Sequence, residues 1–248
     1  MGNVDMLRSY LKEGDSVVFL GGAGTSTDSS IPDFRSASGL YGSEAGAEFL
    51  YPPEVMLSHS FFMENTEEFY RFYLSKMIYK DAKPNYAHSA LAQLELSGKL
   101  KAVITQNIDG LHQMAGSRKV IELHGSVHRN TCLGCGRFYS LEEMLRQADT
   151  GIPKCVCGGV VKPDVVLYEE PLDTELLSEA VGLIADADIL IVGGTSLTVY
   201  PAAGLVDYYR GNRLVLINRS ATGYDAKANL IIKDSIGKVL KEAVNSLE

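Results

Sequence analysis

The chain has 248 residues, of which 46% are hydrophobic and 22% charged, and its net charge is −8. This composition is typical of a globular protein with one large domain and excludes a disordered or fibrous chain. The acidic excess argues against direct binding of nucleic acid, because neutralising phosphates needs lysine and arginine. No stretch has the length and hydrophobicity of a signal peptide or membrane span, so we expect a cytoplasmic protein without a membrane partner.

Short apolar runs alternate with helical patterns along most of the chain. The runs that we expect to be strands lie at 16–20, 102–105, 119–123, 165–168, 188–192, 214–217 and 230–233. Several are apolar almost throughout, as in strands buried on both faces of a parallel sheet. Helical patterns occupy 85–97, 173–186 and 201–210. The alternation predicts an α/β fold with a doubly wound, parallel, Rossmann-like sheet.

Two stretches interrupt this alternation and predict a smaller inserted lobe. Residues 37–84 are rich in aromatic side chains and Met, and we expect them to form a helical module. Residues 126–163 contain every cysteine of the chain, and we expect a zinc ribbon there. The Rossmann-like domain would then consist of residues 1–36, 85–125 and 164–248.

The four cysteines form two close pairs, Cys132-x-x-Cys135 and Cys155-x-Cys157. Such pairs are typical of a structural zinc site in which four thiolates surround the metal. Free or disulfide-bonded cysteines are the alternative, which fits poorly with a cytoplasmic chain whose cysteines share one window. Zinc ribbons occur in nucleic-acid adaptors and in enzymes, so the motif alone does not identify a function.

The first predicted strand ends in Gly21-Gly22-Ala23-Gly24, like the glycine turn of a dinucleotide-binding fold. The third glycine of G-x-G-x-x-G is missing, because Thr27 stands in its place. Pro32-Asp33-Phe34-Arg35 follows, where an ordinary Rossmann enzyme would continue its helix. No acidic residue follows a second strand about 20 residues later to bind a ribose, as hydride-transferring enzymes require.

Polar residues and glycines also follow the other predicted strands. They are Gln106-Asn107-Ile108-Asp109, His124-Gly125, Glu169, Gly193-Gly194-Thr195-Ser196, Asn218 and Asp234-Ser235. Each one alone could cap a helix, form a turn or fill the core. Because ligands bind beyond the carboxyl ends of parallel strands, the set together predicts a nucleotide site.

In this order the motifs resemble the sirtuins of the bacterial type, which are NAD-dependent protein lysine deacylases. The resemblance is carried by 22–26, 31–36, 39–41, 105–112, 122–125, the cysteine pairs, 162–166, 194–197 and Tyr200-Pro201. It implies that NAD is consumed as a co-substrate and that Zn²⁺ is structural. It also implies a monomer that acts on acyl-lysine proteins or peptides. The products would be deacylated lysine, nicotinamide and O-acyl-ADP-ribose.

The resemblance implies three catalytic residues, namely His124, Asn107 and Asp109. His124 would be the general base, because it alone among the histidines follows a predicted strand and precedes a glycine at the ligand edge. Asn107 would orient ribose or water, and Asp109 would bind the nicotinamide carboxamide together with the Ile108 backbone.

The resemblance also implies the binding residues. Asp33, Phe34 and Arg35 would form a lid over the nicotinamide ribose. The other cofactor-binding residues would be Gly22, Ala23, Gly24, Thr27, Gln106, Asn107, Ile108, Asp109, His124, Gly194, Thr195, Ser196, Asn218, Arg219 and Ile236. The backbone carbonyl of Val166 would hold the acyl-lysine amide. The substrate-binding residues would be Val165, Val166, Leu167, Tyr168, Leu197, Val199 and Tyr200, and the zinc ligands Cys132, Cys135, Cys155 and Cys157.

Two departures from the family pattern concern the substrate. Tyr168-Glu169-Glu170 replaces the more usual Phe-Gly-Glu, which leaves the preferred sequence around the lysine open. Tyr70-x-x-Tyr73 stands where members specialised for acidic acyl groups have Tyr-x-x-Arg, so we expect acetyl or longer neutral acyl groups. The alternatives are a sirtuin-like protein ADP-ribosyltransferase, an NAD(P)-linked oxidoreductase and a zinc-ribbon nucleic-acid adaptor.

Overall fold

The computed structural model describes residues 2–36, 39–42, 49–149 and 151–245, so residues 37–38 and 43–48 of the predicted helical module lie outside the described residues. Six parallel strands form the larger sheet, in the order β3-β2-β1-β7-β8-β9. They are β1 (Val17–Gly21), β2 (Leu100–Thr105), β3 (Val120–Glu122), β7 (Ile189–Gly193), β8 (Leu214–Ile217) and β9 (Leu230–Ile232). This order confirms the doubly wound, Rossmann-like sheet, and the direction of winding changes between β1 and β7.

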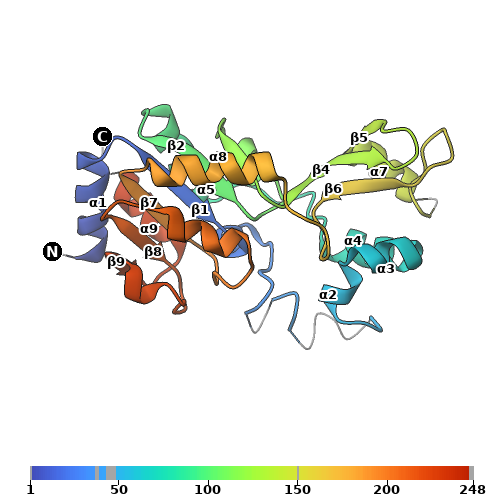
Figure 1. The fold of residues 1–248 in the computed structure, drawn as a ribbon, viewed down its shortest axis with the longest axis horizontal. Coiled ribbons are helices and arrows are strands. Elements are labelled where there is room, and N and C mark those ends of the chain that lie inside the picture. The colour runs from blue at the N-terminus through green and yellow to red at the C-terminus, as the bar shows by residue number, and fades with distance from the viewer. Residues whose placement is uncertain (1, 37–38, 43–48, 150, 246–248) are drawn as a thin grey trace.

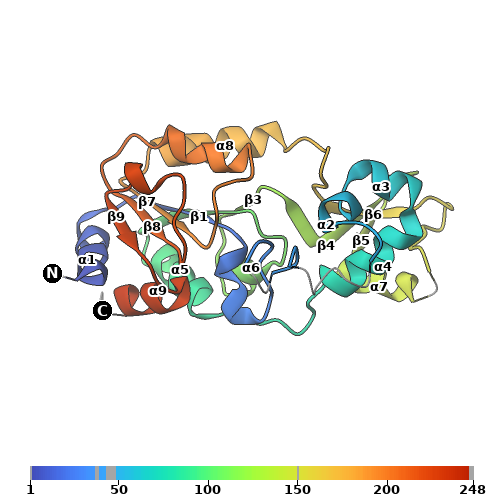
Figure 2. The ribbon, with the colours of Figure 1, turned by 90° about the horizontal axis from the view of Figure 1, so that it is seen from below.

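Helices cover both faces of this sheet (Figure 2). On one face lie α1 (Asn3–Glu13), α5 (Tyr86–Leu96) and α9 (Ile236–Val244), and on the other lie α8 (Thr174–Ala185) and a 3₁₀ helix, Ala202–Tyr208. The side chains of β1 alternate between the two cores. Val17 and Phe19 pack towards α1 and α5, whereas Val18 and Leu20 pack towards α8. Burial on both faces explains why these strands are almost wholly apolar.

The smaller lobe lies at one end of the elongated molecule (Figure 1). Its antiparallel sheet has the order β5-β4-β6, with β4 (Gly125–Cys132), β5 (Phe138–Ser140) and β6 (Val161–Val165). Beside the sheet lie α2 (Pro53–Met56), α3 (His59–Glu64), α4 (Thr66–Lys76) and α7 (Leu141–Ala148). One apolar cluster joins residues 40–73 to residues 127–167, so both inserted stretches share a core. The short helix α6 (Leu111–Met114) follows β2 in the larger domain.

Three predicted elements differ in the structure. The run 165–168 is not a strand of the parallel sheet, because β6 ends at Val165 and pairs antiparallel with β4. A short apolar run does not show which partner a strand finds. The helix expected at 201–210 is a 3₁₀ helix. Helix α7 lies inside the stretch expected to be only a zinc ribbon, and a capping box formed by Ser140 and Glu143 marks its start.

Within the described ranges, every helix is too short or too polar to cross a membrane.

Candidate active site

A cavity of about 880 Å³ lies between the carboxyl ends of the parallel strands and the smaller lobe. Ala23 and Gly24 follow β1, Gln106 follows β2 and Thr195 follows β7, so the loops on both sides of the switch in winding meet at this cavity. Open parallel sheets bind their ligands at this position. The smaller lobe contributes Leu57, Lys76, Met77 and Val165 to the lining.

Of the predicted binding residues, only Gly22 and Leu197 do not line the cavity. The amide of Gly22 donates to the carbonyl of Gly193 at 3.2 Å, and a Cβ at Gly22 would lie 2.8 Å from Cβ of Thr195. Gly22 is thus where the β1 and β7 loops touch. The side chain of Leu197 is buried in the core on the α8 face of the sheet.

The glycine turn after β1 is required by backbone packing. Gly24 donates its N–H to the carbonyl of Gly194 at 2.8 Å, and a Cβ on Gly24 would lie 2.8 Å from Cα of Gly194. Real Cβ atoms do not approach other atoms so closely, so any larger residue would push the two loops apart. The turn therefore closes the floor of the cavity at the switch in winding.

His124 lies between β3 and β4, and its ring lines the cavity. Its Nδ1 is 2.9 Å from the backbone carbonyl oxygen of Gln106. Because a carbonyl oxygen only accepts, Nδ1 carries the proton and Nε2 is left as the basic nitrogen. Burial lowers the pKa of His124 below its ordinary value, and the hydrogen bond to Gln106 offsets only part of this effect. The ring is therefore neutral near pH 7 and able to accept a proton.

The four other histidines, all within the described residues, do not line the cavity. His88 and His112 are buried with their ring centroids 4.7 Å apart. His59 bonds to Glu170 through Nδ1, and Nε2 of His128 lies 3.1 Å from the carbonyl oxygen of Asp109.

Asn107 and Asp109 are joined through Ser26, which the sequence prediction did not include. The Ser26 hydroxyl donates to Oδ2 of Asp109 at 2.6 Å and accepts from Nδ2 of Asn107 at 3.0 Å. The other carboxylate oxygen, Oδ1 of Asp109, accepts from the Leu111 amide at 2.9 Å. All three polar side chains line the cavity. Ser26 belongs to the Gly22–Ser26 motif, which was the signal available in the sequence.

The segment from Asp33 to Arg35 is held against Tyr41 and lines the cavity. Oδ1 of Asp33 accepts from the amides of Arg35 and Ser36, at 3.2 and 2.8 Å, so the backbone turns instead of continuing as a helix. The Tyr41 amide donates to the Phe34 carbonyl at 2.9 Å, and the two rings lie 5.5 Å apart.

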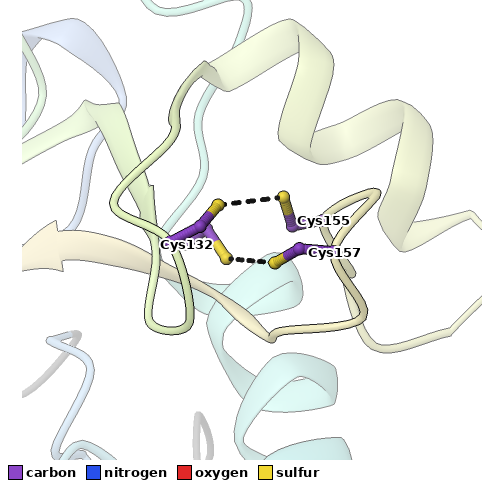
Figure 3. A group of neighbouring side chains, drawn as sticks. Cys132, Cys155 and Cys157 are labelled. Carbon is purple, nitrogen blue, oxygen red and sulfur yellow. Dashed lines mark hydrogen bonds between the residues drawn. The ribbon is translucent and has the colours of Figure 1, made fainter.

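The four cysteine sulfurs lie within 4.8 Å of one another. Figure 3 shows Cys132, Cys155 and Cys157 turned towards a common centre. The distances Cys132–Cys157 and Cys135–Cys155 are 3.5 and 3.6 Å, far longer than a disulfide bond. Tetrahedral zinc with bonds of about 2.3 Å would separate its sulfurs by about 3.8 Å, so four thiolates at these distances fit Zn²⁺.

Tyr70 and Tyr73 are buried in the core of the smaller lobe and do not line the cavity. The Tyr70 hydroxyl donates to the carbonyl of Val161. Burial raises the pKa of both hydroxyls well above the ordinary value, so both stay neutral. The segment compared with the acidic-acyl motif thus packs the interior of the lobe.

Residues 22–201 match the Sir2 family model. The chain belongs to the Sir2 family. A protein of Clostridium acetobutylicum named NAD-dependent protein deacetylase is 59% identical to this sirtuin over 245 residues, which cover 98% of the chain and 99% of the relative. A protein of Clostridium tetani with the same name is 60% identical, with 97% of each chain covered.

Solved Sir2 structures share the fold of this sirtuin. One contains a Sir2 variant with a deacetylated p53 peptide and 3′-O-acetyl-ADP-ribose, and it superposes with a TM-score of 0.89 at 38% identity, covering 98% of both chains. Another contains Sir2 with a p53 peptide and NAD⁺, and its TM-score is 0.86 at 38% identity over 99% of this chain and 98% of the other. A third, Sir2Tm bound to a propionylated peptide, has a TM-score of 0.85 at 38% identity, with 99% and 98% of the two chains covered.

Proposed function

We propose that the cavity carries out the NAD-dependent protein deacetylation of this sirtuin, with His124 as the general base. The main support is the geometry of His124, whose Nδ1–H is fixed on the Gln106 carbonyl while Nε2 remains basic. The activity is that for which the 59% and 60% identical relatives are named. The substrates are NAD and an acyl-lysine peptide, and Zn²⁺ has a structural role in the smaller lobe.

In the first step, the acyl-lysine amide oxygen attacks the anomeric carbon of the nicotinamide ribose, and the bond to nicotinamide breaks. Asp109, held by Ser26 and the Leu111 amide, binds the nicotinamide carboxamide. Holding the two substrates in line supplies much of the rate, because a weak nucleophile becomes effectively intramolecular. Phe34 and Arg35 cover the ribose and exclude water.

In the second step, Nε2 of His124 removes a proton from a ribose hydroxyl, which then attacks the carbon of the former amide. The bond from that carbon to the lysine nitrogen then breaks as the nitrogen takes up a proton, water adds to the carbon, and the bond to the anomeric oxygen breaks, which leaves the acyl group on the ribose hydroxyl. The products are free lysine, nicotinamide and O-acyl-ADP-ribose. Asn107 orients the ribose or water from its position next to Ser26. Val166 holds the amide N–H of the acyl-lysine through its carbonyl.

For the acyl group, we infer a preference for acetyl or longer neutral chains. Neither Tyr70 nor Tyr73 offers a cation, and both are sequestered in the lobe interior. An acyl carboxylate would lose its hydration in the cavity without a charged partner from this helix, which is unfavourable.

The division of the chain into the three predicted units remains part of the proposal. The apolar cluster of the smaller lobe, which is separate from the two clusters of the large sheet, supports the boundary between that lobe and the Rossmann-like domain, whereas the two predicted units of the lobe share this one core. We also infer from composition that the protein is cytoplasmic and does not bind nucleic acid directly, and from the family resemblance that it is a monomer.

Incubation with NAD and an acetyl-lysine peptide tests the function, with nicotinamide, deacetylated peptide and O-acetyl-ADP-ribose measured by mass spectrometry. We expect the three products in equal amounts, almost none with His124→Ala, and slower turnover of a succinyl-lysine peptide. Radiolabel from NAD that stays on the protein would instead indicate ADP-ribosyl transfer. Absorbance of reduced nicotinamide without nicotinamide release would indicate an oxidoreductase.

A further inference from the structure

The segment that follows β6 is paired with the start of α3. The Tyr168 amide donates to the Leu57 carbonyl, and the His59 amide donates to the Tyr168 carbonyl, both at 2.9 Å. Ser58 and Tyr168 thus form a parallel β-bridge between the two inserted parts of the lobe. The same segment reaches the general base, because the Val166 amide donates to the His124 carbonyl at 2.9 Å.

Glu169, the next residue, has a strained backbone. Its φ is 76°, in the left-handed region that is unfavourable for residues other than glycine. Such a conformation persists only when surrounding interactions compensate for its cost.

The compensating interaction is a carboxylate contact with α3. Oε2 of Glu169 accepts from the Ser60 amide at 2.8 Å, and Oε1 accepts from the Ser60 hydroxyl at 3.0 Å. The Ser60 amide lies in the first turn of α3, where backbone N–H groups have no partner within the helix. The strained backbone thus directs the carboxylate onto a donor that the helix itself leaves unpaired.

Glu170 strengthens the same junction. Its Oε1 lies 2.9 Å from Nδ1 of His59, and its Oε2 accepts from the Leu167 amide at 2.8 Å and from Nζ of Lys162 at 3.2 Å. Glu169 is nevertheless distinct from Glu170, because its carboxylate contacts Ser60 and its backbone is left-handed, whereas the carboxylate of Glu170 contacts His59, Leu167 and Lys162.

We propose that Glu169 is a positioning residue for the acyl-lysine peptide, which it serves by fixing the segment Val165–Tyr168 to α3. The inference rests on the proposed function, in which this segment binds the peptide. Ordering the segment when the peptide binds costs less conformational entropy if the segment is already held in place. The contact between Glu169 and Ser60 therefore lowers the peptide KM. The Ser60–Glu169 contact lies on the peptide side, so the KM for NAD is not expected to depend on it.

The test compares Glu169→Gln, Ser60→Ala and the double variant with the wild type, measuring kcat, both KM values and the Kd of an acetyl-lysine peptide without NAD. Glu169→Gln and Ser60→Ala should each raise the peptide KM and Kd by about 3- to 10-fold, as expected for losing one or two hydrogen bonds. The NAD KM and kcat should change less than about 2-fold. The double variant should raise the peptide KM by less than the product of the two single effects, because both substitutions weaken the same contact between Glu169 and Ser60. Glu67→Gln, an exposed glutamate on α4 of the same lobe, is the matched control.

Glu169→Gly separates positioning from folding. Glycine relieves the left-handed strain, so this variant should melt at or above the temperature of Glu169→Gln, yet its peptide KM should remain raised. A wild-type peptide KM in Glu169→Gly or Glu169→Gln would overturn the proposal. Additive effects in the double variant would also overturn it, because they would mean that Glu169 contacts the peptide directly. A wild-type enzyme that forms no deacetylated peptide would instead refute the proposed function.

Discussion

The hydroxyls of Tyr41 and Tyr168 are hydrogen-bonded at 2.6 Å. Tyr41 is held to the Phe34 carbonyl, in the segment proposed to cover NAD, and Tyr168 lies in the segment proposed to bind the peptide. Burial is the main cause, and the hydrogen bond to Tyr168 the second, of a pKa of Tyr41 well above its usual range. The Tyr41 hydroxyl therefore stays protonated. One hydrogen bond thus joins the two substrate sides of the cavity.

Tyr168→Phe should weaken the coupling between the two substrates. In the wild type, saturating peptide should lower the KM for NAD, because the bond transmits the ordering of one segment to the other. Without the hydroxyl, that effect should shrink by about 2- to 10-fold, the worth of one neutral hydrogen bond. Measuring the NAD KM at low and at saturating peptide tests this. Tyr208→Phe, an exposed tyrosine of the 3₁₀ helix, is the control, and equal coupling in both variants would contradict the prediction.

The pH dependence of kcat/KM should report His124. The base must be neutral, and burial lowers its pKa, so activity should persist on the acid side until pH falls below about 6.5, the ordinary histidine value. An acid limb centred above that value would show that another group limits the reaction. Replacement by alanine should reduce deacetylation by about 10²- to 10⁴-fold, the usual contribution of a general base.

His112 should make the fold sensitive to mild acid. Burial, and then the proximity of His88, lower the pKa of His112 to about 3. Below pH 6.5 the unfolded chain binds a proton that the folded chain excludes, so the free energy of unfolding falls as pH falls. Protonation of this single group should lower the free energy of unfolding by about 2 kcal/mol between pH 7 and pH 5.

Urea unfolding of the wild type and His112→Phe at pH 7 and pH 5 measures this effect. The phenylalanine variant should lose about 2 kcal/mol less than the wild type over that interval. An identical loss in both proteins would mean that His112 becomes protonated without penalty in the folded state.

The cysteine cluster should bind one zinc ion per chain and stabilise the smaller lobe. Cys155→Ser should lose the metal, lower the melting temperature and raise the peptide KM, because Cys155 and Cys157 lie in the loop before β6, which leads into Val165–Tyr168. Atomic absorption of the purified protein and thermal melting with a chelator measure these effects. A metal-free protein with unchanged melting would show that the thiols do not need zinc.

The fold class and many residues of the candidate site could be predicted from the sequence itself. Apolar runs such as Val17–Gly21 can only be buried on both faces, which requires a parallel sheet with helices on each side. The residues directly after those runs must then share one edge, so Asn107, Asp109 and His124 could be assigned to one site before any contact was known. The cysteine spacing likewise identified a four-sulfur cluster.

Only the tertiary structure decided how the site residues contact one another. Local pattern did not show that 165–168 leaves the parallel sheet, since pairing depends on a partner strand distant in sequence. The bridge from Ser26 to Asp109 and the contact of Glu169 with Ser60 join residues 83 and 109 positions apart. Leu197 shows the same limit, because its neighbours on the folded sheet place it in the core. Periodicity and motifs are local, whereas these contacts exist only after distant segments have packed together.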